Sequence, residues 1–375
     1  MPALFLYTTP IADCGAKCYN IENLAREVCR MKRLYAVLLT LGMLLSLCAC
    51  GTGDTADRQT DTPNAAADTQ ENDTQQPYTT VDMPYVGMIL KSTDNPLFAL
   101  LKAGAEDEAD ALGVQVMVVS PDTEADSDAQ ATLLDTMATM AVDVIAIAPS
   151  EEAALTDGLK QAVKNGKIII AVDSCMDFKN TECYIGTDQY NAAYKQGAYA
   201  AKLVAETENA NAVILRGAEG DKTHTLRQYG LEDGLHDGDA HVLAVEPCDS
   251  SEEEAAECMA QLLEQYGDLN VVCTTNDSMA VGAQRAIAES GRDIHIVSFD
   301  GMQEATELVR VGEIDAVFAQ DAYEMGRQCI RNAVKLYQGE TVDSSIYTDV
   351  TCIEQGDAQA HLDDIDRKLK HLGTK

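Results

Sequence analysis

The sequence predicts an α/β protein with two doubly wound parallel-sheet lobes. From Tyr85 onward, apolar runs of strand length alternate with amphipathic stretches of helical length. The runs are apolar throughout, which is typical of parallel strands that helices bury on both faces. Nine or more such strands are better divided between two sheets than placed in one.

The expected strands and helices follow one another along the chain. Strands are expected at residues 85–90, 114–119, 142–148, 167–172, 211–215, 241–245, 270–275, 293–299 and 314–320. Amphipathic helices are expected between them, for example at Pro96–Ala111, Ala129–Met140, Glu152–Asn165, Tyr190–Thr207, Glu252–Tyr266, Ser278–Ser290 and Tyr323–Tyr337.

An export signal precedes this body, but it begins at Met31 rather than at Met1. The stretch "MKRLYAVLLTLGMLLSLCAC" has a basic start and an apolar run too short to span a bilayer comfortably. Its end resembles the lipobox of bacterial lipoproteins, which implies a signal peptide over residues 31–49 and lipidation of Cys50. An ordinary cleaved signal or a membrane anchor is the alternative.

The segments on either side of the signal have simpler interpretations. Residues 1–30 are expected to be an upstream extension that is not translated, with the true start at Met31, because a signal peptide works at the N-terminus. Residues 50–81 are polar and contain almost no large apolar residue. Such a segment cannot bury enough surface to fold, so we expect a flexible acidic linker behind the lipid anchor.

Polar side chains stand at the end of nearly every expected strand. In doubly wound sheets, ligands bind beyond the carboxyl ends of the strands. The residues at these ends, or in the loop that follows, are Lys91, Asn95, Asp173, Arg227, Asn276, Asp300 and Gln320. Together they are the donors and acceptors that a ring of hydroxyl groups requires.

Six motifs resemble the periplasmic sugar-binding proteins of the ribose and allose type, the type I substrate-binding components of ABC transporters. They are "KSTDNPLF", "LKAGAEDEADALG", "AVDS", "TNDSMAVGAQRAI", "VSFDG" and "AVFAQD". The resemblance covers about residues 83–350. It implies two lobes joined by a three-strand hinge, with residues 82–187 and 321–349 in the first lobe and residues 188–320 and 350–375 in the second.

The resemblance also implies a set of ligand-binding residues. They are Lys91, Asn95, Phe98, Asp173, Arg227, Asn276, Asp300 and Gln320. Lys91 favours the allose-type relatives over the ribose type. Three positions depart from the pattern: Ser174 replaces an arginine, Leu97 replaces an aromatic residue, and no aromatic residue occurs around Asp249. Phe98 is therefore the one clear partner for stacking on a sugar ring.

Other kinds of site are less consistent with the residues. "GAEGDKTH" at residues 217–224 has neither the spacing nor the adjacent Gly-Lys of a phosphate loop. Its His224 is expected to be a solvated loop residue, with a place at the edge of the cleft as the alternative. Asp173 and Asp300 are expected to accept hydrogen bonds. The enzymatic alternative is that they form the catalytic carboxylate pair of a glycosidase. No metal site and no cofactor is expected. Cys175–Cys183 and Cys248–Cys258 remain open as local disulfides.

The sequence therefore predicts a binding protein rather than an enzyme. The formal net charge of -35 excludes binding to nucleic acid through its phosphates. We expect a monomeric lipoprotein, anchored outside the cell membrane, that captures a monosaccharide and delivers it to an ABC transporter permease. A sensor that presents a sugar or furanose signal to a chemoreceptor or sensor kinase is the alternative. A cytoplasmic repressor is excluded, because an export signal stands where its DNA-binding helices would lie.

Overall fold

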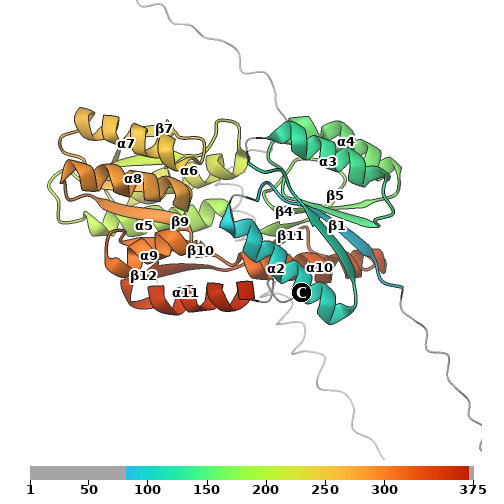
Figure 1. Cartoon of the computed structure of the whole chain (residues 1–375). Coiled ribbons are helices and arrows are strands. Elements are labelled where there is room, and N and C mark those ends of the chain that lie inside the picture. The colour runs from blue at the N-terminus through green and yellow to red at the C-terminus, as the bar shows by residue number, and fades with distance from the viewer. Residues whose placement is uncertain (1–81, 94, 125, 371–375) are drawn as a thin grey trace, which may run out of the picture. The chain divides into compact units, whose positions relative to one another are not determined.

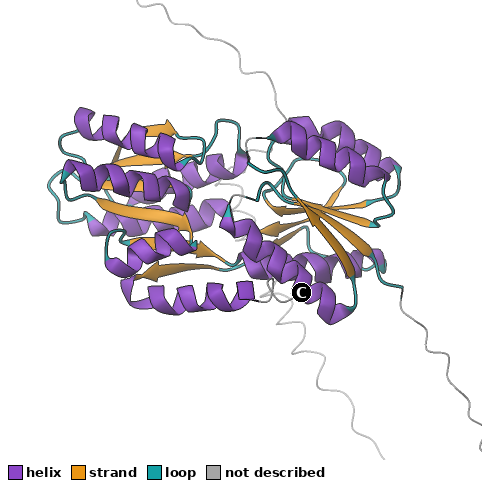
Figure 2. Cartoon of the chain, in the orientation of Figure 1, coloured by secondary structure: helices purple, strands orange, loops and turns teal. Residues whose placement is uncertain are grey.

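The structure is a computed structural model that describes residues 82–93, 95–124 and 126–370. The predicted signal peptide, Cys50 and the predicted linker lie outside these residues. Within them the chain forms two six-stranded sheets, each with helices on both faces (Figure 1, Figure 2). The predicted fold class, two doubly wound α/β lobes, is confirmed.

The first lobe contains a wholly parallel sheet with the strand order β11-β5-β4-β3-β1-β2. Its strands are β1 (Tyr85–Ile89), β2 (Gln115–Val119), β3 (Val144–Ile147), β4 (Ile168–Asp173), β5 (Thr181–Gly186) and β11 (Ser345–Tyr347). Its helices are α2 (Pro96–Leu112), α3 (Ser127–Thr139), α4 (Glu152–Lys164) and α10 (Ala322–Tyr337).

The second lobe repeats this arrangement with the strand order β12-β10-β9-β8-β6-β7. Its strands are β6 (Asn211–Arg216), β7 (His241–Pro247), β8 (Val271–Thr274), β9 (His295–Asp300), β10 (Ala316–Gln320) and β12 (Val350–Glu354). Its helices are α5 (Gln189–Leu203), α6 (Lys222–Asp237), α7 (Glu252–Gln265), α8 (Asp277–Ser290), α9 (Gln303–Val311) and α11 (Gln355–Leu369). The edge strand β12 pairs antiparallel with β10, and the other pairs are parallel.

Alternate residues of each strand point into different cores, which explains why the strands read as continuous apolar runs. In β3, Val144 and Ala146 pack with α2 and α10, whereas Ile145 and Ile147 pack with α3 and α4. The second sheet is divided in the same way, with α5 and α6 on one face and α7, α8 and α9 on the other.

Helices α2 and α10 approach each other closely because glycine lies at their contact. A Cβ atom on Gly104 would stand 1.9 Å from the backbone oxygen of Tyr323, and one on Gly326 would stand 2.0 Å from that of Leu101. Any larger residue would push the helices apart. This contact fixes α10 on the first lobe, although the strand that precedes α10 belongs to the second.

The chain crosses between the lobes three times, after β5, after β10 and after β11. Hydrogen bonds tie the crossings together. The Oγ1 atom of Thr187 donates to Oε1 of Gln320 at 2.6 Å, the Thr348 amide donates to the Gly186 carbonyl at 2.9 Å, and the Asp321 amide donates to the Asp349 carbonyl at 3.3 Å. The two lobes are thus joined by three short connections that contact one another.

Candidate ligand-binding site between the lobes

A narrow cavity lies between the lobes, where the carboxyl ends of strands from both sheets meet. Its volume of about 20 Å³ is close to the space of one water molecule. It is lined by Lys91, Asn95, Leu97, Phe98, Glu124, Asp173, Thr223, His224, Arg227, Asn276 and Asp300. The structure thus brings together every residue that the sequence predicted for the site except Gln320.

A wider compartment of about 270 Å³ adjoins this cavity and shares Lys91, Glu124 and His224 with it. Its remaining lining residues are Ser127, Ser150, Glu151, Ala218, Glu219, Gly220, Asp221, Asp249 and Ser250. Both lobes contribute to each space. We call the 20 Å³ space the inner cavity and the 270 Å³ space the outer compartment.

Lys91 follows β1 and is almost fully buried, with 3% of its surface exposed. Its Nζ atom lies 3.1 Å from Oδ2 of Asp221, at the start of α6 in the opposite lobe. Burial alone would lower the pKa of Lys91, but the charge of Asp221 and neighbouring carboxylates outweighs burial and raises the pKa. Lys91 therefore stays charged and forms an ion pair that bridges the lobes.

Asn95 is held by two hydrogen bonds within the first lobe. Its Oδ1 atom accepts from the Leu97 amide at 2.9 Å, which caps α2, and Pro96 occupies the first helical position. Its Nδ2 atom donates to Oε1 of Glu124 at 2.8 Å. Asn95 thus fixes the direction of a carboxylate that the sequence analysis did not identify as part of the site.

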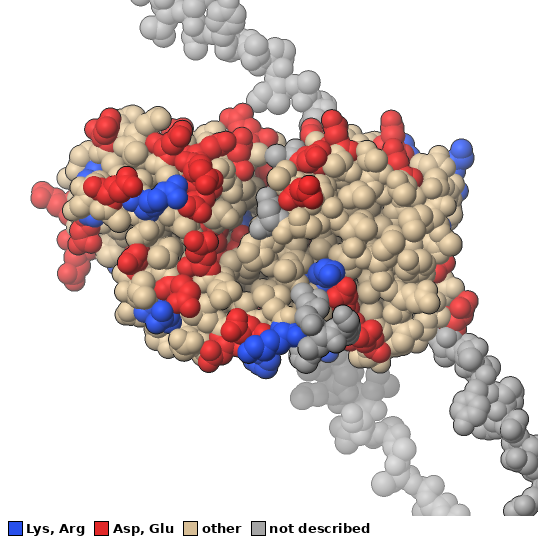
Figure 3. All heavy atoms as spheres, viewed as in Figure 1, with Lys and Arg blue, Asp and Glu red and all other residues tan. Residues whose placement is uncertain are grey.

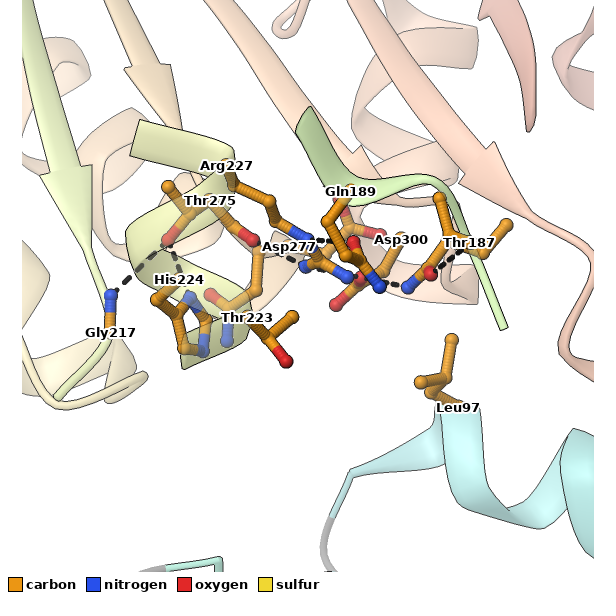
Figure 4. Close-up of polar contacts among 12 residues, drawn as sticks. Leu97, Thr187, Gln189, Gly217, Thr223, His224, Arg227, Thr275, Asp277 and Asp300 are labelled. Atoms are coloured by element: carbon orange, nitrogen blue, oxygen red, sulfur yellow. Dashed lines mark hydrogen bonds and ion pairs between the residues drawn. The ribbon is translucent and has the colours of Figure 1, made fainter. Parts of the chain in front are cut away.

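Leu97 and Phe98 form the apolar part of the inner cavity. Both side chains are buried and belong to the core beneath α2, so they cannot swing freely into solvent. Figure 4 shows Leu97 on α2, facing the polar network of the second lobe. The first turn of α2 therefore presents a rigid apolar wall to the cavity.

Asp173 ends β4 with a backbone φ of 61°. This left-handed conformation is uncommon outside glycine. The Oδ2 atom of Asp173 accepts from Oγ of Ser174 at 3.0 Å, and Ser174 in turn accepts from Oγ1 of Thr223 in the second lobe at 2.9 Å. Ser174, at a position where the resemblance implied an arginine, thus joins the lobes.

Arg227 lies on α6, whereas the sequence analysis placed it in a loop. Its Nε atom donates to Oε1 of Gln189 at 2.8 Å. Its Nη1 atom donates to the Thr275 carbonyl at 2.7 Å and to Oδ1 of Asp300 at 3.0 Å (Figure 4). The guanidinium carbon also lies 4.1 Å from the centre of the Phe299 ring, within cation–π distance. These contacts hold the group in one orientation.

Asp300 and Gln320 connect the site to the lobe crossings. The Nε2 atom of Gln320 donates to Oδ1 of Asp300 at 2.7 Å, and its Oε1 atom accepts from Thr187. Gln320 thus lies behind the cavity wall rather than on it. Burial raises the pKa of Asp300, and the charge of Asp173 adds to this effect while Arg227 opposes it.

Asn276 lines the inner cavity and caps α8, because its Oδ1 atom accepts from the Met279 amide at 3.0 Å. The following residue, Asp277, is buried beneath the site. Burial raises the pKa of Asp277, and repulsion from Asp300 raises it further. One helix start thus supplies an amide donor to the cavity and a second carboxyl group behind it.

His224 is buried in the first turn of α6, so its prediction as a solvated loop residue was wrong. Its Nδ1 atom lies 2.7 Å from Oγ1 of Thr275, and its Nε2 atom lies 3.2 Å from Oγ of Ser250. Burial, helped by nearby Arg227, lowers the pKa of His224 to about 3. The ring is therefore neutral at neutral pH and lines both the inner cavity and the outer compartment.

The helix start of α6 is closed to phosphate, as the spacing of "GAEGDKTH" predicted. The Oδ1 atom of Asp221 accepts from the amides of Thr223 and His224 at 2.7 and 3.2 Å. The free amides that would attract an anion are thus occupied by a carboxylate of the protein.

Glu124 and Thr223 were missed by the sequence analysis. Glu124 lies in the connection between β2 and α3, within the polar run "SPDTEADSDA". Nothing local distinguishes it from its solvated acidic neighbours. Its role emerges from contacts with Asn95 and with the inner cavity, which depend on the folded lobe.

The cysteines of the described residues are free thiols, so neither local disulfide left open by the sequence is formed in this structure. Cys183 and Cys248 are buried, whereas Cys175 and Cys258 are partly exposed. Nowhere in the described part of the chain do three or more His, Cys, Asp or Glu side chains gather in a way that could hold a metal ion.

Comparison with known protein families assigns the chain. Residues 86–341, about two thirds of its length, match the model of the periplasmic binding protein domain. The chain belongs to this family. Its two lobes, joined by three chain crossings, and the cavity at the strand ends agree with that membership.

Within the described residues, every helix is too short or too polar to span a bilayer.

Relatives in this family are named for sugars. The chain is 26% identical over 318 residues to the ribose import binding protein RbsB of Bacillus subtilis, covering 84% of this chain and 97% of the relative. It is 25% identical over 249 residues to the D-allose-binding periplasmic protein of Escherichia coli, covering 64% of this chain and 80% of the relative.

Solved structures of periplasmic binding proteins share the fold. A solute-binding protein from Actinobacillus succinogenes with bound D-allose aligns with a TM-score of 0.68 at 23% identity, over 74% of this chain and 99% of that one. One from Agrobacterium radiobacter in complex with D-arabinose aligns with a TM-score of 0.70 at 24% identity, over 76% and 99%. At these identities the likeness concerns the fold alone.

Proposed function

We propose that this chain is an extracytoplasmic substrate-binding protein that captures a monosaccharide of the ribose or allose kind between its lobes and delivers it to the permease of an ABC transporter. The names of the curated relatives support this proposal. It makes the chain a binding protein without catalytic activity of its own.

The observation that carries the proposal is the ring of rigidly held hydrogen-bonding groups at the strand ends. Asp173 and Asp300 supply carboxylate oxygens, and Arg227 and Asn276 supply N–H groups. A sugar hydroxyl both donates and accepts, so it needs acceptors and donors side by side. Phe98 offers an apolar surface to the C–H face of the ring.

The remaining three residues have less direct roles in this proposal. Lys91 has three N–H groups, so it keeps donors for a hydroxyl while one group pairs with Asp221. Asn95 caps α2 and orients Glu124, and it contributes its second amide hydrogen to the ligand. Gln320 holds Asp300 in place and links the site to the crossing at Thr187.

Ligand entry in this proposal requires the lobes to separate. The inner cavity of about 20 Å³ is far smaller than a monosaccharide, which has several times the volume of a water molecule. The three crossings are short segments at element ends, which is where hinges absorb backbone rotation. We infer that the lobes are closed here and that they separate to admit a sugar.

We further propose that the chain is lipid-anchored and monomeric. Translation would begin at Met31, residues 31–49 would be removed as a signal peptide, and Cys50 would carry the lipid. Residues 50–81 would serve as a tether between the membrane and the lobes, so that the protein remains close to its permease.

A thermal-shift screen of the purified protein against monosaccharides tests the proposal. A ligand that binds only the folded state adds about 2.7 kcal/mol of stability at a hundred times its dissociation constant. We expect at least one monosaccharide to raise the melting temperature, with one site per chain by calorimetry. If no pentose or hexose of the panel raises the melting temperature, the assignment is overturned.

A further inference from the structure

Both cations that line the inner cavity are already paired with carboxylates of the protein. Lys91 lies 3.1 Å from Asp221, and Arg227 lies 3.0 Å from Asp300. All four side chains are largely buried, with between 4% and 14% of their side-chain surface exposed. An anionic group on a ligand would have to compete with these partners for either cation.

Two carboxylates of the inner cavity, in contrast, form no direct ion pair with a cation of the described residues, although both lie near enough to Lys91 to interact with its charge. Oε1 of Glu124 accepts from the neutral amide of Asn95, and within that same part of the chain no donor reaches Oε2. Asp173 accepts from the hydroxyl of Ser174 through one oxygen. Each carboxylate oxygen can accept two hydrogen bonds, so both residues retain unfilled acceptors at the cavity.

The outer compartment adds to this excess of carboxylates over cations. Beyond Glu124 it is lined by Glu151, Glu219, Asp221 and Asp249, and its one described cation is Lys91, already paired with Asp221. A cleft lined mainly by one sign of charge focuses its field on whatever enters. Glu124 lies where the two spaces meet, since it lines both.

The protonation behaviour of Glu124 agrees with this geometry. Burial raises the pKa of Glu124, and the charges of Asp173 and Asp221 add to the effect, although Lys91 and Asn95 oppose it. The ionised carboxylate is thus incompletely compensated by the protein. A positive charge on a ligand at this position would complete the compensation.

We propose, building on the function above, that the ligand is an amino sugar whose protonated amine is received by Glu124. The ring hydroxyls of such a ligand bond to Asp173, Arg227, Asn276 and Asp300, as for a neutral sugar. The ammonium group donates up to three hydrogen bonds and fills the free acceptor of Glu124. Sugar acids and sugar phosphates are rejected, because they bring a negative charge to unpaired carboxylates.

Calorimetry with matched sugars on the full-length mature protein tests this inference. The probes are glucose, glucosamine and glucuronate, the corresponding galactose and mannose series, and ribose and allose, at a mildly acidic pH that keeps the amines protonated. At least one amino sugar should bind about tenfold or more tightly than its neutral parent, as one charge-assisted hydrogen bond provides.

The variant Glu124→Gln isolates the charge, because the glutamine oxygen can still accept from Asn95. It should abolish the preference, so that the amino sugar and its neutral parent bind this variant with affinities within about threefold of each other. Glu206→Gln, an equal charge change at an exposed position that lines neither space, should leave the preference unchanged.

The outcomes separate this inference from the proposed function. If neutral sugars bind at least as tightly as their amino counterparts, or if sugar acids bind more tightly, the amino-sugar inference is overturned and the sugar-binding function stands. If Glu124→Gln retains the preference, Glu124 is not the receiving group and the inference also fails. If no sugar of any charge class binds, the proposed function itself is overturned.

Discussion

The ion pair of Lys91 and Asp221 joins the two lobes across the cleft, so its removal should weaken ligand binding rather than the folding of either lobe. In the closed protein both side chains are desolvated, with 4% and 14% of their surface exposed. When the lobes separate, each returns to water. Replacing one partner therefore penalises the closed state alone, by leaving the other charge buried without its ion-pair partner.

The size of the effect follows from the burial of the pair. Breaking a buried ion pair by removal of one partner typically costs about 3–5 kcal/mol. Since about 1.4 kcal/mol corresponds to a tenfold change in an equilibrium constant, Asp221→Asn should weaken sugar binding by roughly two orders of magnitude or more. Asparagine is itself a good capping residue, so α6 should keep its start.

Titration calorimetry with the tightest sugar, together with small-angle scattering, measures this effect. Asp221→Asn and Lys91→Met should both bind the sugar weakly. Their radius of gyration should stay large at sugar concentrations that reduce the radius of the unchanged protein. Lys222→Gln is the matched control. It removes the Lys222–Asp177 pair, which also joins the lobes but is exposed, and should change affinity by less than about fivefold. Affinities within threefold of the unchanged protein in both test variants would refute the reasoning.

Three further predictions concern other parts of the chain. Asn95→Ala should lower the unfolding free energy by about 1 kcal/mol through loss of the α2 cap, and should weaken sugar binding about tenfold or more because the ligand loses the amide hydrogen that Asn95 donates to it. The folded pKa of His224, about 3, lies below its ordinary 6.5, so its contribution to stability is lost as pH falls below 6.5. Between pH 7 and pH 5, the stability of the unchanged protein relative to His224→Gln should therefore fall by about 2 kcal/mol. Cys50→Ala should leave the precursor unprocessed or release the protein into the medium, in cells where synthesis starts at Met31.

Each of these has a control and a contradicting result. Asn95→Ser keeps a capping hydroxyl but has no amide hydrogen for the ligand, so it should lose affinity and retain stability. Unchanged affinity in both Asn95 variants would make the turn purely structural. Parallel pH profiles of unfolding for the unchanged protein and His224→Gln would contradict the buried neutral ring. Peptides from residues 1–30 in protein isolated from cells would exclude the start at Met31.

The fold could be predicted from the sequence because each central strand is a recognisable apolar run. The runs in β1, β3 and β4 are apolar on both faces, which local composition shows directly. The strands β5, β11 and β12 did not appear as apolar runs. Their sequences, "TECYIG", "SIY" and "VTCIE", mix polar and apolar residues. Such strands are specified by neighbours in the sheet and by their place at or near its edge, and not by periodicity.

Site residues at the ends of strands could be predicted from the sequence. Residues whose role depends on tertiary contacts could not. Lys91, Asp173 and Asp300 follow apolar runs, so their place at the cleft could be anticipated. The partner of Lys91 is Asp221, 130 residues away, and no local pattern links the two. Glu124 likewise looks like a solvated acid until folding brings it against Asn95.

The most direct test of sugar capture between the lobes is a crystal structure of the protein with the tightest sugar from the screen. We expect electron density for one sugar ring between the lobes, with its hydroxyls bonded to Asp173, Arg227, Asn276 and Asp300 and its C–H face against Phe98. A sugar bound at another surface, with no sugar density between the lobes, would contradict the account.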